Sequence, residues 1–83
     1  LMELGKTQEA IDQYVKAAGK EENLMSTPYF LMKAALGYED LNNYSKSIEI
    51  YKKLRSDFPQ TTEGRDAEKF QARAEGLLSQ KAK

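Results

Sequence analysis

The chain has 83 residues, of which 40% are hydrophobic and 31% are charged, and its 13 basic and 13 acidic side chains balance to a formal net charge of zero. This length allows one small domain, and the charge balance argues against binding to nucleic acid or to an anionic membrane surface. The chain has no Cys and no His, which removes disulfides, thiol nucleophiles, the usual zinc ligands and the commonest general base. We therefore expect no metal, no cofactor and no enzymatic activity.

The first helix is predicted from residue 8 to about residue 20. The pair Gly5–Lys6 is typical of a turn, and Thr7 is a good N-cap residue. Apolar side chains then recur on one helical face, at Ala10, Ile11, Tyr14, Ala17 and Ala18. Residues 1–4 are interpreted as the end of a truncated helix, so the chain is expected to belong to a longer protein. The polar stretch 19–26 predicts a longer loop or an extended helix end.

Residues 27–59 predict two helices joined by a tight turn. Thr27 suits an N-cap and Pro28 the first helical position, where no backbone donor is needed. One helical stripe follows, at Leu31, Ala34, Ala35, Tyr38 and Leu41. Asn42–Asn43 then interrupts the pattern, because Asn tolerates left-handed backbone geometry in turns, and Ser45 is expected to cap the next helix. A second stripe at Ile48, Tyr51, Leu54 and Phe58 ends at Pro59.

These two helices share an order of residue types with a known family. The positions are a large residue, a small pair, a Tyr, a turn residue, a Tyr, a small residue, an aromatic residue, a second small position and a closing Pro. They fall in turn at Leu31, Ala34, Ala35, Tyr38, Asn42, Tyr44, Ser47, Tyr51, Leu54 and Pro59. This order resembles the tetratricopeptide repeat, although Ser47 and Leu54 stand where that family usually has Ala. An overlay that aligns Tyr14 with Tyr51 also aligns Gly5, Ala10 and Ala17 with Asn42, Ser47 and Leu54. The distance in sequence between the aligned residues, such as Tyr14 and Tyr51, exceeds the family's period of about 34 residues.

The resemblance implies an all-α fold, in which antiparallel helical hairpins stack as a short right-handed solenoid. Residues 1–22 would form a truncated repeat and residues 27–59 a complete one. Thr61–Thr62 offers another N-cap, and a further stripe follows at Ala67, Phe70, Ala74, Leu77 and Leu78. Because the other faces of this segment are polar, residues 62–81 are predicted to form a C-terminal capping helix. Gly64 and Gly76 are expected to weaken it, by about 1 kcal/mol each if fully interior.

The run from Asp57 to Ala67 resembles the closing segment of tetratricopeptide proteins of the bacterial cell envelope. That resemblance implies a bacterial, membrane-anchored protein whose repeats lie outside the cytoplasm. The chain itself is not expected to insert into a membrane, because its longest apolar run, at 29–32, is far shorter than the ~20 residues needed to cross a bilayer. The glycosylation triplet at residues 43–45 is interpreted as turn chemistry.

The family resemblance also implies that the first helix of each repeat lines a concave recognition groove. In the central repeat the residues on that side are Tyr29, Met32, Leu36 and Glu39, and the last helix would add Asp66, Phe70 and Arg73. We predict a partner-binding groove formed by Tyr29, Met32, Leu36, Glu39 and Arg73. Its apolar and aromatic character suits an extended peptide or an amphipathic helix. Because the central line has no basic residue, the family's variant groove for C-terminal carboxylates is not expected here.

The expected function is a non-catalytic protein–protein interaction scaffold that binds a protein or peptide partner. The same side chains would also suit packing against other repeats. Two alternative functions stay open at this point: a structural segment that self-associates as a homodimer, and a regulatory repeat array attached to an enzyme outside these residues. Homodimer formation follows if Ile11, Tyr14 and Ala18 lack a covering helix, because exposed apolar stripes favour association.

Overall fold

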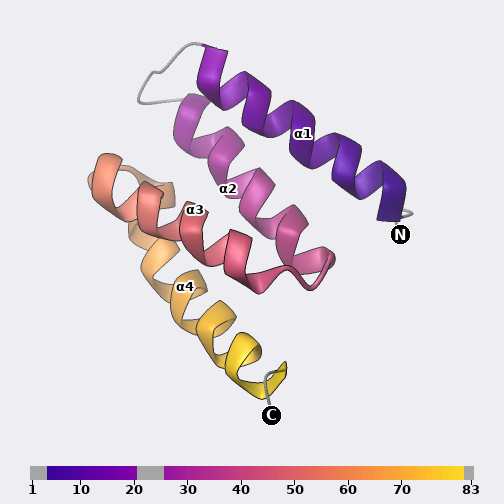
Figure 1. The fold of residues 1–83 in the computed structure, drawn as a ribbon. Coiled ribbons are helices and arrows are strands. Elements are labelled where there is room, and N and C mark those ends of the chain that lie inside the picture. The colour runs from indigo at the N-terminus through magenta and orange to yellow at the C-terminus, as the bar shows by residue number, and fades with distance from the viewer. Residues whose placement is uncertain (1–3, 21–25, 82–83) are drawn as a thin grey trace.

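The computed structural model describes residues 4–20 and 26–81, and within these ranges the chain forms helices and turns with no strand. Four helices follow one another: α1 (Leu4–Lys20), α2 (Ser26–Asp40), α3 (Tyr44–Asp57) and α4 (Thr62–Lys81). Consecutive helices run in opposite directions and pack side by side, and α2 also contacts α4 (Figure 1). The predicted all-helical class is therefore confirmed.

Two predicted helix starts are wrong. α1 begins at Leu4, so Gly5–Lys6 is helical and Thr7 lies inside the helix instead of capping it. Thr7 is only 5% exposed, and such packing outweighs the weak helical preference of the segment. α2 begins at Ser26, which places Thr27 and Pro28 within the first turn. Pro28 is tolerated there because the first four N–H groups of a helix have no partner within it.

Two further predictions lie partly outside the described residues. Residues 1–3 and 21–25 lie outside them, so the predicted helix end at 1–4 is described only at Leu4. The predicted loop at 19–26 is described only at its two ends. There α1 continues through Gly19 to Lys20, and α2 starts at Ser26.

The α2–α3 turn has the predicted Asn chemistry. Asn42 has a φ of 60°, in the left-handed region, and the N–H of Asn43 donates to the carbonyl of Tyr38 at 2.8 Å. The Asn43 side chain accepts from the N–H of Lys46 at 3.4 Å, which makes Asn43 the N-cap of α3. The predicted cap at Ser45 is therefore wrong, because Asn43 already occupies the capping position and Ser45 lies inside α3.

The core lies where α2, α3 and α4 meet. Its buried members are Leu31, Ala35, Ile48, Tyr51, Leu54, Phe58, Ala67 and Ala74, joined by Ala18 from α1. α3 lies between α2 and α4 and contacts both. Consequently Tyr51 and Leu54 are fully buried, whereas Tyr38 is half-buried. Most residues of the stripes predicted in α2 and α3 thus face the interior.

α4 has a buried face and a polar face. Thr61 precedes it, and the Thr61 hydroxyl accepts from the N–H of Gly64 at 3.0 Å, so the predicted N-cap is confirmed. Ala67 and Ala74 are fully buried, while the outer side chains are exposed, at Arg65, Glu68, Ala72, Glu75 and Ser79. This polarity is what a helix at the end of a stack requires, and the capping role itself stays a prediction.

Ser47 provides a first test of the packing between α2 and α3. Its hydroxyl is fully buried and donates to the Ala35 carbonyl at 2.7 Å. We expect Ser47→Ala to lower the free energy of unfolding by about 1 kcal/mol, through the lost hydrogen bond. Ser47→Val should cost more, about 1–3 kcal/mol beyond that, because a larger side chain at a fully buried position must displace its neighbours. Urea denaturation of both variants checks this, and equal stabilities would contradict the tight contact.

Candidate interaction surface

Four side chains form a cluster that joins α2, α3 and α4, here named the Glu39 cluster: Glu39, Tyr51, Phe70 and Arg73. The Glu39 carboxylate accepts from Arg73 Nη2 at 2.8 and 3.0 Å and from the Tyr51 hydroxyl. The Arg73 guanidinium lies 4.8 Å from the centre of the Phe70 ring. That ring stacks on Tyr51 with the centroids 6.0 Å apart. The Glu39 side chain is 10% exposed and that of Arg73 is 50% exposed.

The environment of the Glu39 cluster keeps the Tyr51 phenol neutral and Arg73 charged. Burial raises the pKa of Tyr51, because ionisation would place a charge in the interior, and the hydrogen bond to Glu39 raises it further. The hydrogen bond to Glu39 likewise raises the pKa of Arg73. At neutral pH the cluster therefore combines a neutral phenol with an ion pair. Such a phenol donates a hydrogen bond and stabilises the contact between the three helices.

Alkaline unfolding tests this arrangement. Above pH ~10 the unfolded chain loses the Tyr51 proton while the folded chain keeps it, so the free energy of unfolding falls as pH rises, by up to about 1.4 kcal/mol per pH unit. We expect Tyr51→Phe to reduce this fall. Urea denaturation between pH 8 and 11 measures it, with the exposed Tyr29→Phe as the control that keeps the wild-type slope. Equal slopes in Tyr51→Phe and the wild type would contradict the assignment.

A second feature is a hollow of about 260 Å³ between α1 and α2, here named the α1–α2 groove. It is lined by Thr7, Ala10, Ile11, Tyr14, Lys33, Leu36, Gly37 and Asp40. At its base the two helices approach closely, since a Cβ on Gly37 would lie 2.6 Å from Ile11 Cγ1. The absence of a side chain at Gly37 thus permits this contact.

Aromatic rings border the α1–α2 groove. Tyr14 stacks on Phe30 at 6.3 Å between centroids, and Tyr29 meets Phe30 edge-on at 5.5 Å. The Lys33 ammonium lies 5.5 Å from the centre of the Tyr29 ring. Tyr29 is 47% exposed. A large aromatic side chain is therefore accessible next to the groove.

The five predicted groove residues do not lie together in the structure. Leu36 lines the α1–α2 groove. Tyr29 contacts Lys33, which also lines the groove. Glu39 and Arg73 bind each other in the Glu39 cluster, and Met32 packs against the core. Their predicted contact with a partner stays a prediction. The sequence interpretation missed Lys33 and Asp40, although their spacing of three and four residues from Leu36 places them on the same helical face.

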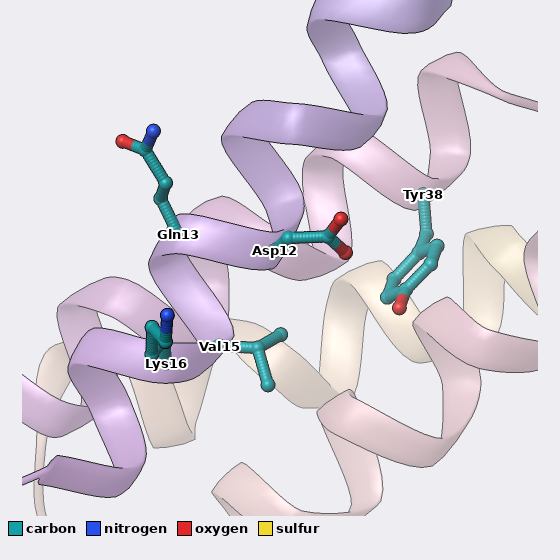
Figure 2. Close-up of a pocket in the computed structure, with 5 residues that line it drawn as sticks. All are labelled: Asp12, Gln13, Val15, Lys16 and Tyr38. Atoms are coloured by element: carbon teal, nitrogen blue, oxygen red, sulfur yellow. The ribbon is translucent and has the colours of Figure 1, made fainter.

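Another hollow, of about 290 Å³, is lined by Asp12, Gln13, Val15 and Lys16 of α1 and by Tyr38 of α2. Figure 2 shows Asp12 and Val15 pointing towards Tyr38, while Gln13 and Lys16 point away from it. Val15 is 44% exposed. Val15 and Tyr38 supply its apolar surface, beside the Asp12 carboxylate.

Within residues 4–20 and 26–81, no three acidic side chains come together in a way that could hold a metal ion. None of the helices described combines the length and the apolar character that crossing a bilayer requires. Comparisons with family models, with curated proteins and with solved structures gave no match to this chain.

Proposed function

We propose that this chain is a non-catalytic protein-interaction module of the tetratricopeptide type, and that the α1–α2 groove with Tyr29 receives a helix or an extended peptide. In this proposal the hairpins stack as a right-handed solenoid, α4 caps the stack, and the module belongs to a bacterial envelope protein. The residue pattern of 31–59 supports the repeat assignment. The polar outer face of α4 supports its role as a cap.

One observation supports the groove most strongly. Ala10, Tyr14 and Ala17 in α1 are half-buried, whereas the residues aligned with them in α3, which are Ser47, Tyr51 and Leu54, are fully buried. The difference arises because α3 has a helix on either side, while α1 contacts only α2 among the helices described. The α1 face thus has the composition of a buried helix face and is covered on one side only.

The side chains around the groove indicate the chemistry of the partner. Leu36 and Ala10 offer apolar contacts, and Tyr14 adds a rigid ring with a polar tip. Lys33 and Asp40 place opposite charges at the rim. A partner helix with an apolar stripe flanked by charges satisfies all of these groups, as in other complexes where an amphipathic helix binds a groove.

Capture of partners by the full-length protein tests the proposal. Leu36→Lys places a charge in the groove, and we expect it to weaken binding of the captured partner at least about tenfold, or ~1.4 kcal/mol. Ala72→Lys, on the exposed outer face of α4, is the matched control and should bind as the wild type does. Quantitative mass spectrometry of the captured proteins, then calorimetry on the purified pair, measures the difference. Equal binding by both variants would contradict the groove assignment.

A further inference from the structure

Two opposite charges lie on either side of Leu36 along α2. Lys33 and Asp40 are both exposed, and both line the α1–α2 groove. Leu36 and Gly37 lie midway between them in the sequence. With a helical rise of 1.5 Å per residue, the two charged residues are about 10 Å apart along the helix axis. The exposed face of α2 therefore has a positive end, an apolar centre and a negative end.

This pattern is complementary to itself under twofold symmetry. In a symmetric dimer the same surface of both copies forms the contact, so that residue i meets residue j and residue j meets residue i. If two α2 helices lie antiparallel about an axis near Leu36, each Lys33 faces Asp40 of the second copy. The two Leu36 side chains then meet at the centre. The chain has a formal net charge of zero, so no overall repulsion opposes the approach of two copies.

The same symmetry operation also covers α1. α1 and α2 of one copy would pack on α1 and α2 of the other as an antiparallel four-helix arrangement, which is a stable way to bury apolar helix faces. Ala10 and Tyr14 would then gain the cover that Ser47 and Tyr51 have in α3. The uncovered face and the charge pattern therefore favour the same occupant.

We infer that the occupant of the α1–α2 groove is a second copy of this chain, held by two reciprocal Lys33–Asp40 contacts around Leu36. This inference rests on the proposed function, because it identifies the partner of the same groove. It also specifies the orientation of the two copies, which reciprocal charge substitutions can test.

Sedimentation equilibrium over a dilution series of the chain measures the association. Lys33→Asp and Asp40→Lys each create two like-charge contacts, and we expect each variant to dimerise about tenfold more weakly than the wild type or worse. A mixture of the two variants should restore association to within about threefold, because two acidic side chains of one variant then face two basic side chains of the other. Native mass spectrometry identifies the resulting heterodimer by mass.

Two further variants keep the test decisive. The double substitution Lys33→Asp with Asp40→Lys restores both opposite-charge contacts and should dimerise as the wild type does, even if one single variant folds poorly. Lys52→Asp makes the same charge change at an exposed position of α3 and should leave association unchanged.

A wild-type chain that stays monomeric throughout the dilution series would overturn the inference, and so would a mixture that associates no better than its components. If the wild type is monomeric while Leu36→Lys abolishes capture of another protein, the second copy is excluded as the occupant and the proposed interaction groove stands.

Discussion

Replacing Gly64 with Ala is expected to lower the free energy of unfolding by about 2–4 kcal/mol. A Cβ at this position would overlap the carbonyl oxygen of Phe58 and lie 2.8 Å from its carbonyl carbon. The oxygen cannot easily move, because it accepts from the N–H of Thr61 at 3.2 Å and from the Thr61 hydroxyl at 2.8 Å. Phe58 itself is buried, at 7% exposed. The substitution would therefore disrupt the α3–α4 turn.

Gly76 provides the matched control in the same helix. It is exposed, and a Cβ there would meet nothing within 4 Å. We expect Gly76→Ala to raise the free energy of unfolding by about 0.5–1 kcal/mol, because Ala has the higher helix propensity and a less flexible unfolded chain. Urea denaturation of both variants shows whether the free energy of unfolding falls in Gly64→Ala and rises in Gly76→Ala. If both substitutions stabilise the protein, the close contact at Gly64 does not exist.

These two glycines show where local sequence reasoning succeeds and where it stops. Helix propensity alone predicts that both glycines weaken α4. Propensity is sufficient for Gly76, because a Cβ there would contact nothing within 4 Å. At Gly64 the deciding contact is with Phe58, in the preceding turn, and no helical pattern reveals it. The turn at Asn42 and the helix end before Pro59 were predictable, because they depend on backbone preferences of single residues. The start of α1 was not, since it depends on the packing of Thr7.

The candidate site depends on helical spacing, which the sequence contains, and on the tertiary arrangement, which helical spacing does not reveal. Helical spacing places Tyr29, Leu36 and Glu39 in one line along α2. In the structure α1 lies beside Leu36 and α4 beside Glu39, so adjacent positions on one helical face have different neighbours. Which helix flanks each edge of a face depends on the tertiary arrangement. Spacing within a single helix does not contain that information.

Replacing Glu39 with Ala is expected to lower the free energy of unfolding by about 2–3 kcal/mol. The Tyr51 hydroxyl would remain buried without its acceptor, and Arg73 would lose its ion pair. Glu39→Gln should cost less, about 1 kcal/mol, because the amide oxygen can still accept from Tyr51. Arg73→Ala should cost about 0.5–1 kcal/mol, since Arg73 is half exposed and water screens its charge. Guanidinium or urea denaturation of the three variants measures these losses, and we expect the largest for Glu39→Ala.

A double-mutant cycle isolates the contribution of the buried hydroxyl. Tyr51→Phe removes the donor, so Glu39→Ala in that background no longer leaves a buried polar group unpaired. We expect the cost of Glu39→Ala to fall there by about 1–2 kcal/mol, which is the coupling energy between the two residues. Arg73→Ala with Tyr51→Phe measures a second coupling, because Arg73 Nη2 donates to both Glu39 oxygen atoms and one of them also accepts from Tyr51. An unchanged cost of Glu39→Ala in the Tyr51→Phe background would show that the hydrogen bond to Tyr51 does not stabilise the contact between α2 and α3.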